Sequence, residues 1–203
     1  MSDTKKTART RGRPRAFCEE AALDAAAALF AERGFDAVTI AELTDAMGIR
    51  PPSFYAAFGS KAAAYERVLD RAITADPFVT EALEGAESLR DGLRALLRAA
   101  ARRYADGTGC LVAEGVRACT DEAARGAAAA RLAGTRAAVE RFAETRGADG
   151  ARVAGLTVTA LLGLSAAARA GAQMGEGPRA GERTEVLDAF ARLTADAIAR
   201  DAG

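Results

Sequence analysis

Residues 39–61 read TIAELTDAMGIRPPSFYAAFGSK, and this stretch predicts a helix, a sharp turn, a second short helix and the start of a third. Thr39 and Glu42 have the spacing of a capping box, in which each residue satisfies an amide of the other at the start of a helix. Gly48 permits the tight turn, because glycine adopts backbone conformations that other residues avoid. A helix-turn-helix of this kind offers a short, rigid helix to the major groove of DNA.

The second of these helices is expected over residues 51–58. Its two prolines stand in the first turn, where a missing amide costs no hydrogen bond. Phe54 and Phe58 lie four residues apart and would form its inward face. The residues that would face outward at the start of this helix are Arg50, Pro51, Pro52, Ser53 and Tyr55.

These outward residues have the chemistry of DNA contacts. Arg50 could bind guanine O6 and N7 with its forked guanidinium group, and the two prolines could touch a thymine methyl group. The Tyr55 hydroxyl and the Lys61 ammonium suit phosphate oxygens, which position a protein without specifying sequence. The alternatives are that Arg50 and Lys61 are solvated surface charges and that Tyr55 is a packing residue.

The charges are unevenly distributed along the chain. The whole chain has 28 Lys and Arg residues and 28 Asp and Glu residues, a balance that alone argues against a general nucleic-acid binder. Residues 1–15, however, contain six cations and one carboxylate, whereas residues 16–60 contain two cations and seven carboxylates. Arg11, Arg13 and Arg15 lie in the run RGRPR, which resembles a minor-groove AT-hook. Attraction to DNA should therefore depend on this arm; the alternative is a disordered solubilising tail.

The composition predicts an all-helical protein. Alanine, leucine and arginine are abundant and favour helices, and no window alternates Val, Ile or Thr as a strand would. Asp76-Pro77 should end a helix. Outside the opening stretch, helices are expected at about 19–33, 60–75, 88–105, 110–118, 120–146, 151–173 and from 184 onward, with Thr120 and Thr184 as caps. Ile73 is expected to continue the buried core pattern, and Val186, Leu187, Phe190, Leu193, Ala197 and Ile198 are expected to form an apolar stripe along the last helix.

Residue types exclude several functional classes. The chain has no His, and its cysteines, Cys18, Cys110 and Cys119, have no paired spacing. A zinc site and a His-based catalytic triad are therefore excluded, and we expect no metal, no cofactor and no enzymatic activity. Cys110 and Cys119 are interpreted as small core residues. Cys18 is a candidate redox switch, because a helix N-terminus activates a thiol.

A membrane location is not expected. The basic N-terminus lacks the apolar region of a secretory signal. The uncharged stretch 153–168 is about 16 residues long, shorter than the roughly 20 needed to cross a bilayer, and is interpreted as a buried helix. We therefore expect a cytoplasmic protein.

The chain resembles the TetR family of bacterial transcriptional regulators over residues 11–73. The resemblance is carried by RGRPRAF, by ALDAAAALFAERGFDAVTIAELTDAMGI and by PPSFYAAFGSK. It implies a homodimer that places two recognition helices in successive major grooves of a palindromic operator, about 34–36 Å apart. It also implies an effector pocket in each C-terminal half and repression that a small molecule relieves.

The resemblance implies a role for particular residues. Thr39, Tyr55 and Lys61 would contact phosphates, and Arg50, Pro51, Pro52 and Ser53 would lie against base edges. Ala56 and Ala57 replace polar residues common in the family, which leaves two possible DNA-backbone contacts in doubt. Cys18 stands where an aspartate is common, so the first helix loses a better cap.

Three segments are expected: a basic flexible arm at 1–15, a helix-turn-helix DNA-binding domain at 16–60, and a ligand-binding and dimerisation domain at 61–203. Residues 60–75 would form a helix linking the two domains, with Asp76-Pro77 as a pivot for ligand-driven motion. Dimerisation is expected through the last two helices; the alternative is that the helix at 151–173 belongs to the core of the monomer.

The C-terminal half is expected to hold the effector pocket. Candidate pocket residues are Tyr104, Arg117, Thr157, Thr159 and Met174. The alternative is that Met174 and the threonines simply pack and that Arg117 faces water. Two alternatives to a ligand-released repressor are a DNA-binding regulator without an effector and a helical-bundle carrier or enzyme. No nucleophile–base pair supports the second alternative.

Overall fold

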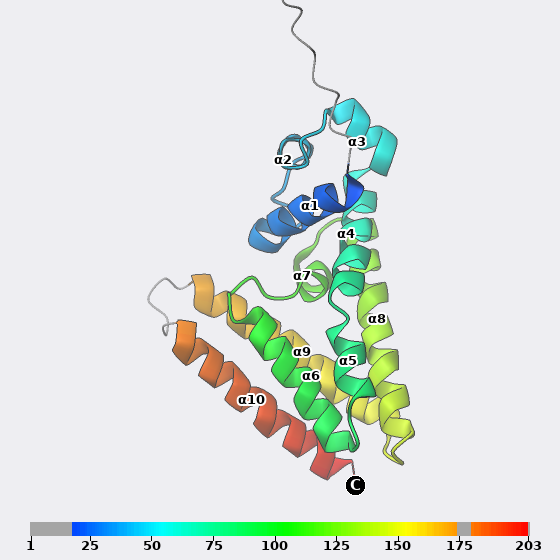
Figure 1. Cartoon of the computed structure of the whole chain (residues 1–203), viewed down its shortest axis with the longest axis vertical. Coiled ribbons are helices and arrows are strands. Elements are labelled where there is room, and N and C mark those ends of the chain that lie inside the picture. Colours follow the sequence, from blue (N-terminus) through cyan, green and yellow to red (C-terminus); the bar gives the residue numbers. More distant parts are fainter. Residues whose placement is uncertain (1–17, 174–179, 203) are drawn as a thin grey trace, which may run out of the picture.

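The computed structural model describes residues 18–173 and 180–202, and these residues form helices and connections without a strand. The expectation of an all-helical protein is confirmed. The helices are α1 (Glu19–Arg33), α2 (Ile40–Ala46), α3 (Pro51–Phe58), α4 (Lys61–Ala75), α5 (Phe78–Glu84), α6 (Leu89–Tyr104), α7 (Leu111–Ala118), α8 (Glu122–Glu144), α9 (Gly150–Gln173) and α10 (Ala180–Asp201). In Figure 1, α2 and α3 lie at one end of the molecule, and α10 lies toward the other.

The first four helices share one hydrophobic core. Its largest side chains are aromatic: the rings of Phe30 and Phe35 each meet the Tyr65 ring edge-on, with centroids 5.0 and 5.1 Å apart. Cys119, Ala124 and Ala128 also belong to this core, although they lie far along the chain, at the end of α7 and in α8. The start of α8 therefore packs with the N-terminal helices.

A second hydrophobic core lies among α5, α6, α8, α9 and α10. Leu93, Leu96 and Leu97 of α6 are completely buried in it, together with Val139 of α8 and Leu164 of α9. Since α6 packs on both α9 and α10, these three long helices form the body of the C-terminal half. Helix α4 descends toward this half from α3 (Figure 1).

Local signals set most helix ends. Gly34 and Gly59 end α1 and α3 with positive φ angles of 76° and 75°, a region in which glycine is unstrained. Ser60 begins α4 by accepting a hydrogen bond from the Ala63 amide at 3.0 Å. Ser88 begins α6 in the same way, through the Asp91 amide at 3.1 Å. These residues fix where the elements start, which in turn fixes which faces are buried.

The structure contains one helix that the sequence does not predict, and two expected caps are wrong. The unpredicted helix is α5, a short helix of seven residues after Pro77. Asp121, not Thr120, caps α8 by accepting from the Ala124 amide, and the Thr120 amide instead donates to the Asp36 carboxylate at 2.9 Å. Thr184 lies inside α10, which already begins at Ala180.

One expectation about burial is also wrong. Ile73 is 44% exposed near the end of α4. The expected stripe on α10 divides between two faces: Leu187 and Ile198 are buried, but Val186, Phe190 and Leu193 are exposed. The buried face is completed by small residues, Ala191 and Ala195, which let α10 approach its neighbours closely. Hydrophobicity alone could not separate the two faces, because both are apolar.

Within the described residues, Gly150–Gly171 of α9 is long and apolar enough to cross a membrane by length and composition, with a mean hydropathy of 1.5. The same composition is typical of a core helix. Half of this stretch is buried inside the structure, where α9 packs against α6, α8 and α10. The packing agrees with the interpretation of this stretch as a buried helix.

Gly115 of α7 tests how closely α4, α7 and α8 pack. A Cβ atom at this position would lie 2.6 Å from both the Ala128 Cβ and the Tyr65 hydroxyl. Gly115→Ala should therefore lower the free energy of unfolding by about 1–3 kcal/mol. Gly126→Ala is the matched control in α8, because no atom lies within 4 Å of its added Cβ; it should raise stability by about 0.5–1 kcal/mol. Urea unfolding measures both, and equal stability of the two variants would contradict the close packing.

Candidate nucleic-acid interface

The capping box at the start of α2 is present and is extended by an arginine. The Thr39 hydroxyl accepts from the Glu42 amide at 3.3 Å, and the Thr39 amide donates to Glu42 Oε2 at 2.8 Å. The same hydroxyl donates to Glu42 Oε2 at 2.7 Å, and Arg33 of α1 forms an ion pair with the other carboxylate oxygen. Arg33 also donates to the Ala37 carbonyl at 3.0 Å. Arg33 thus fixes α2 against α1, while both donors of Thr39 are already engaged.

Helix α3 has a buried face and an exposed face. Phe54 and Phe58 are buried with ring centroids 5.2 Å apart, as their spacing predicts. The exposed residues are Arg50, Pro51, Pro52, Ser53, Tyr55, Ala56 and Ala57. Tyr55 is 52% exposed and meets the Phe54 ring edge-on at 5.7 Å. The predicted contact residues therefore lie together on an open surface.

The first turn of α3 offers no free amides to an anion. Pro51 and Pro52 have no N–H, and the Ser53 amide donates to the Arg50 carbonyl at 2.9 Å. A helix N-terminus usually attracts phosphate through such amides. In α3 this route is closed, so the side chains of the exposed face must make its contacts.

Arg67 of α4 positions the C-terminal end of α3. No sequence motif indicates this role for Arg67. Its guanidinium donates to the Ala57 carbonyl at 3.2 Å and lies over the Phe58 ring, 5.2 Å from the centroid. It also forms an ion pair with Glu19 at the start of α1. These partners are 10 and 48 positions away in the chain, so only the fold brings them together.

Lys61 lies at the start of α4, beside the helix-turn-helix. Its ammonium group is 4.2 Å from the centroid of the Phe35 ring. Burial lowers the pKa of Lys61, while the nearby carboxylates of Asp36 and Asp121 act in the opposite direction. The side chain is therefore only partly open to a phosphate in this structure. The arginines of the N-terminal arm, Arg11, Arg13 and Arg15, lie outside the described residues.

Cys18 is the exposed residue that precedes α1, and its side chain makes no cap hydrogen bond. Cys119 is buried in the N-terminal core, and Cys110 is half-buried against the C-terminal core. Groups of three or more His, Cys, Asp or Glu residues placed to bind a metal are absent from the described part of the chain.

The candidate ligand residues differ in their exposure and in their partners. Tyr104 and Thr157 are buried, and the Thr157 hydroxyl has no hydrogen-bond partner. Arg117 is exposed and forms an ion pair with Glu114, and the exposed Thr159 donates to the Gly155 carbonyl. Met174 lies outside the described residues.

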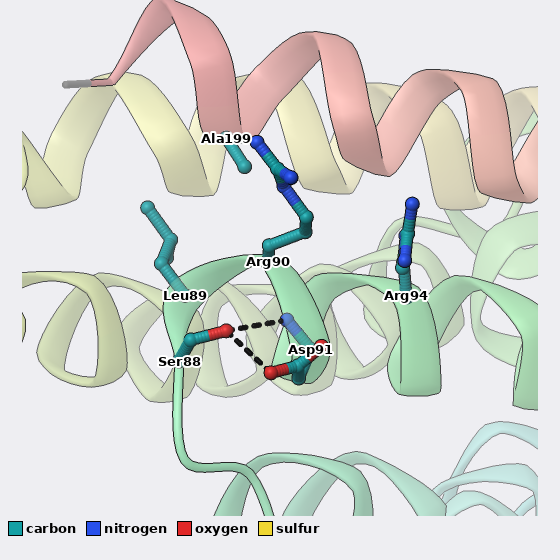
Figure 2. Close-up of a pocket in the computed structure, with 6 residues that line it drawn as sticks. All are labelled: Ser88, Leu89, Arg90, Asp91, Arg94 and Ala199. Atoms are coloured by element: carbon teal, nitrogen blue, oxygen red, sulfur yellow. Dashed lines mark hydrogen bonds between the residues drawn. The ribbon is translucent and has the colours of Figure 1, made fainter.

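Two surface grooves follow α6. One, of about 500 Å³, is lined by Ser88, Leu89, Arg90, Asp91, Arg94 and Ala199. Figure 2 shows Arg90 and Arg94 extending from α6 toward α10, and Ser88 hydrogen-bonded to Asp91. The other groove, of about 700 Å³, lies between α5 and α6 and includes Phe78, Arg98 and Arg102. Neither groove contains a candidate ligand residue, and Arg94 is paired with Asp196 at 2.7 Å.

A family model described as "Bacterial regulatory proteins, tetR family" matches residues 22–68, which span α1 to α4. A cysteine mutant of the TetR family transcriptional regulator CifR, solved in complex with 26bp double-strand operator DNA, is 32% identical with a TM-score of 0.72, covering 89% of this chain and 98% of that chain. This chain belongs to the TetR family.

Membership makes the chain a DNA-binding transcription regulator rather than an enzyme. Among curated relatives, the HTH-type transcriptional repressor BdcR of Escherichia coli (strain K12) is 48% identical over 122 residues, which are 56% of this chain and 59% of BdcR. The repressor ComR of the same strain is 43% identical over 65 residues, 32% of this chain and 31% of ComR. The chain thus spans less than two thirds of the curated relatives it matches.

Glu42 gives the helix-turn-helix a predictable response to pH. Arg33 and the hydrogen bonds from Thr39 lower the pKa of Glu42 from 4.5 to about 2. A carboxyl group whose pKa is lower in the folded protein stabilises the fold above its unfolded pKa, and this contribution is lost as the pH falls through the folded pKa. Glu42→Gln should therefore be less stable than the wild type at pH 7, with a shallower loss of stability between about pH 4.5 and pH 2.

Thermal unfolding across this range measures the difference. Glu32→Gln is the control, because Glu32 is an exposed carboxylate of α1 outside the capping box. It should leave the pH profile unchanged. A Glu42→Gln profile parallel to that of the wild type would show that the capping box does not depend on the charge.

Proposed function

We propose that the chain is a homodimeric, cytoplasmic repressor that binds a palindromic operator and is released by a small-molecule effector. The observation that carries the DNA-binding part is the exposed face of α3, where Arg50, Ser53 and Tyr55 project from a helix fixed by two buried phenyl rings. CifR, 32% identical, was solved on operator DNA, and BdcR is a repressor, which supports the same role for this chain.

The proposed contacts follow from side-chain chemistry. Arg50 would bind a guanine edge, while Pro51, Pro52 and Ser53 would lie against neighbouring bases. Tyr55 and Lys61 would bind phosphates, and Arg11, Arg13 and Arg15 would enter the adjacent minor groove. A phosphate contact by Thr39 would compete with its bonds to Glu42. We retain the proposed division into an arm at 1–15, a DNA-binding domain at 16–60 and a sensing domain at 61–203.

Dimerisation is proposed through α9 and α10. Leu193 is 71% exposed, and with Val186 and Phe190 it forms an apolar face on α10. On α9, Leu156 is exposed, and the exposed small residues Gly163, Ala166 and Ala167 would let a second helix approach closely. A contiguous apolar surface of this kind is unusual on a monomer and typical of an interface.

Effector binding is proposed for the C-terminal half, near Tyr104 and Thr157. The buried Thr157 hydroxyl lacks a partner, and an unpaired buried hydroxyl costs free energy that a polar ligand atom could recover. Arg117, Thr159 and Met174 remain weaker candidates. A ligand acts only through different affinities for the two states of the protein, and Asp76-Pro77 is the proposed pivot. The second candidate function is regulation without an effector, which the absence of the described candidate ligand residues from both α6 grooves favours.

The DNA contacts are tested by binding to the DNA upstream of the chain's own gene. The wild type should prefer this DNA to a scrambled duplex, and an added effector should reduce binding. Arg50→Ala should cost about 1–3 kcal/mol and relax specificity at one base position. Lys61→Ala should weaken binding to all sequences and lower the salt slope by about 1 per half-site. If Arg50→Ala instead changed only the salt slope, the assignment of Arg50 to a base would be wrong.

The dimer interface is tested by placing a charge on the apolar face of α10. Leu193→Asp should convert the dimer to a monomer, because an unpaired carboxylate would be buried at the interface. Analytical ultracentrifugation measures the mass. Glu185→Asp on the same helix, at another exposed position, is the control and should stay dimeric. A dimeric Leu193→Asp variant would place the interface elsewhere.

A further inference from the structure

Arg169 of α9 connects the two halves of the molecule. Its side chain is 13% exposed, and Nη1 donates to the Ala31 carbonyl of α1 at 2.9 Å and to the Thr108 carbonyl at 2.8 Å. Its Nε lies 3.3 Å from Oε2 of Glu114 in α7, whose side chain is 9% exposed. One guanidinium group therefore binds α1, the α6–α7 turn and α7 together.

The contact with Ala31 serves the end of α1. Ala31 lies in the last turn of this helix, where carbonyl groups lack amide partners within the helix. A cation is favoured there, because the helix dipole is negative at its C-terminal end. Arg169 thus acts as a cap for α1, although it lies 138 positions away in the chain.

The α6–α7 turn is fixed to α9 at a second point. The Ser165 hydroxyl accepts a hydrogen bond from the Cys110 amide at 2.9 Å. Gly109 has a φ of +71°, and a Cβ atom there would lie 2.8 Å from the Ser165 hydroxyl. Ser165 and Arg169 are four residues apart on α9, so they lie on the same side of the helix. The turn before α7 therefore follows α9 closely.

Helix α7 also contacts the DNA-binding half directly. The Tyr65 hydroxyl of α4 donates to the Leu111 carbonyl at 2.9 Å, in the first turn of α7. Beyond the end of α7, the Thr120 amide donates to Asp36, which lies in the connection between α1 and α2. A displacement of α7 relative to α9 must therefore strain or break bonds to α1, α4 or this connection.

We propose that Arg169 is a positioning residue that sets the orientation of the helix-turn-helix by binding the end of α1. This inference rests on the proposed function in DNA binding. The three acceptors of Arg169 belong to three separate elements, so binding all of them restrains α1, the α6–α7 turn and α7 relative to one another. An event that moves the turn or α7 relative to α9 would shift the guanidinium group and change its restraint on α1, and with it on the recognition helix. Arg169 thus couples the C-terminal half to DNA affinity without touching DNA.

The experiment compares full-length variants on two operators. One is the native operator, and the other carries one extra base pair between its half-sites. A fixed orientation of the two recognition helices favours the native spacing. Arg169→Met should lower the ratio of the affinity for the native operator to the affinity for the lengthened operator by about tenfold. A change of this size lies within the usual range of coupling between sites. Arg169→Lys should lower it less, since lysine keeps the charge but lacks the fork.

Arg152→Met is the matched control, because Arg152 is on the same helix but pairs with Asp201 of α10. It should leave the ratio unchanged. The ratio separates positioning from stability, because a variant that merely folds less well binds both operators more weakly in proportion. An unchanged ratio in Arg169→Met overturns the inference, whether or not its overall affinity falls.

Two further readouts keep the test decisive. Thermal unfolding establishes that each variant is folded. If Arg169→Met does not fold, the ratio of operator affinities measured for Arg169→Lys decides. A ratio equal to that of the wild type then overturns the inference. The wild type is also compared on native operator and scrambled duplex. Equal binding of the wild type to these two duplexes would overturn the proposed function itself. If the wild type does prefer the operator but Arg169→Met keeps the wild-type ratio, only the positioning role of Arg169 is overturned.

Discussion

The buried Tyr65 side chain determines how the two halves of this protein meet. Its ring packs edge-on against Phe30 and Phe35, which fixes α4 against α1 and against the connection that leads to α2. A buried phenol needs a hydrogen-bond acceptor, and the Leu111 carbonyl of α7 supplies it at 2.9 Å. Burial also raises the pKa of Tyr65 far above its usual value, so the hydroxyl remains a donor. One side chain therefore joins the N-terminal core to a helix of the C-terminal half.

The electrostatic design of the recognition surface follows from the prolines of α3. A regulator with no net charge cannot rely on a general attraction to phosphate. Pro51 and Pro52 remove the amides that would otherwise bind an anion at the start of α3. This leaves the exposed side chains of α3 as the groups available for recognition, with Arg50 at its N-cap as the proposed base contact. This arrangement favours sequence reading over general affinity.

Local chemistry explains what could be predicted from the sequence. The helix-turn-helix was predicted to within a residue, because the capping box at Thr39, the prolines of α3 and the cap at Ser60 act on neighbouring amides. The roles of the exposed residues on α3 remain predictions. Errors arose where the deciding partner is distant: Thr120 was assigned as a cap, but its amide is bound by Asp36, 84 positions away. For the same reason the sequence does not indicate Arg67 and Arg169, since their partners are backbone carbonyls and carboxylates that only the fold brings near.

The recognition helix α3 depends on contacts with residues that are distant in the chain. Helix α3 has eight residues, and an isolated helix of that length is marginal in water. Its geometry therefore depends on packing by Phe54 and Phe58, and on Arg67, which binds its last turn. The same core contains Ala124 and Ala128 of α8, so the core that supports α3 extends into the C-terminal half. The orientation of α3 therefore depends on residues from both halves of the chain, and a rearrangement of α7 and α8 can reach α3 through this shared core as well as through Arg169.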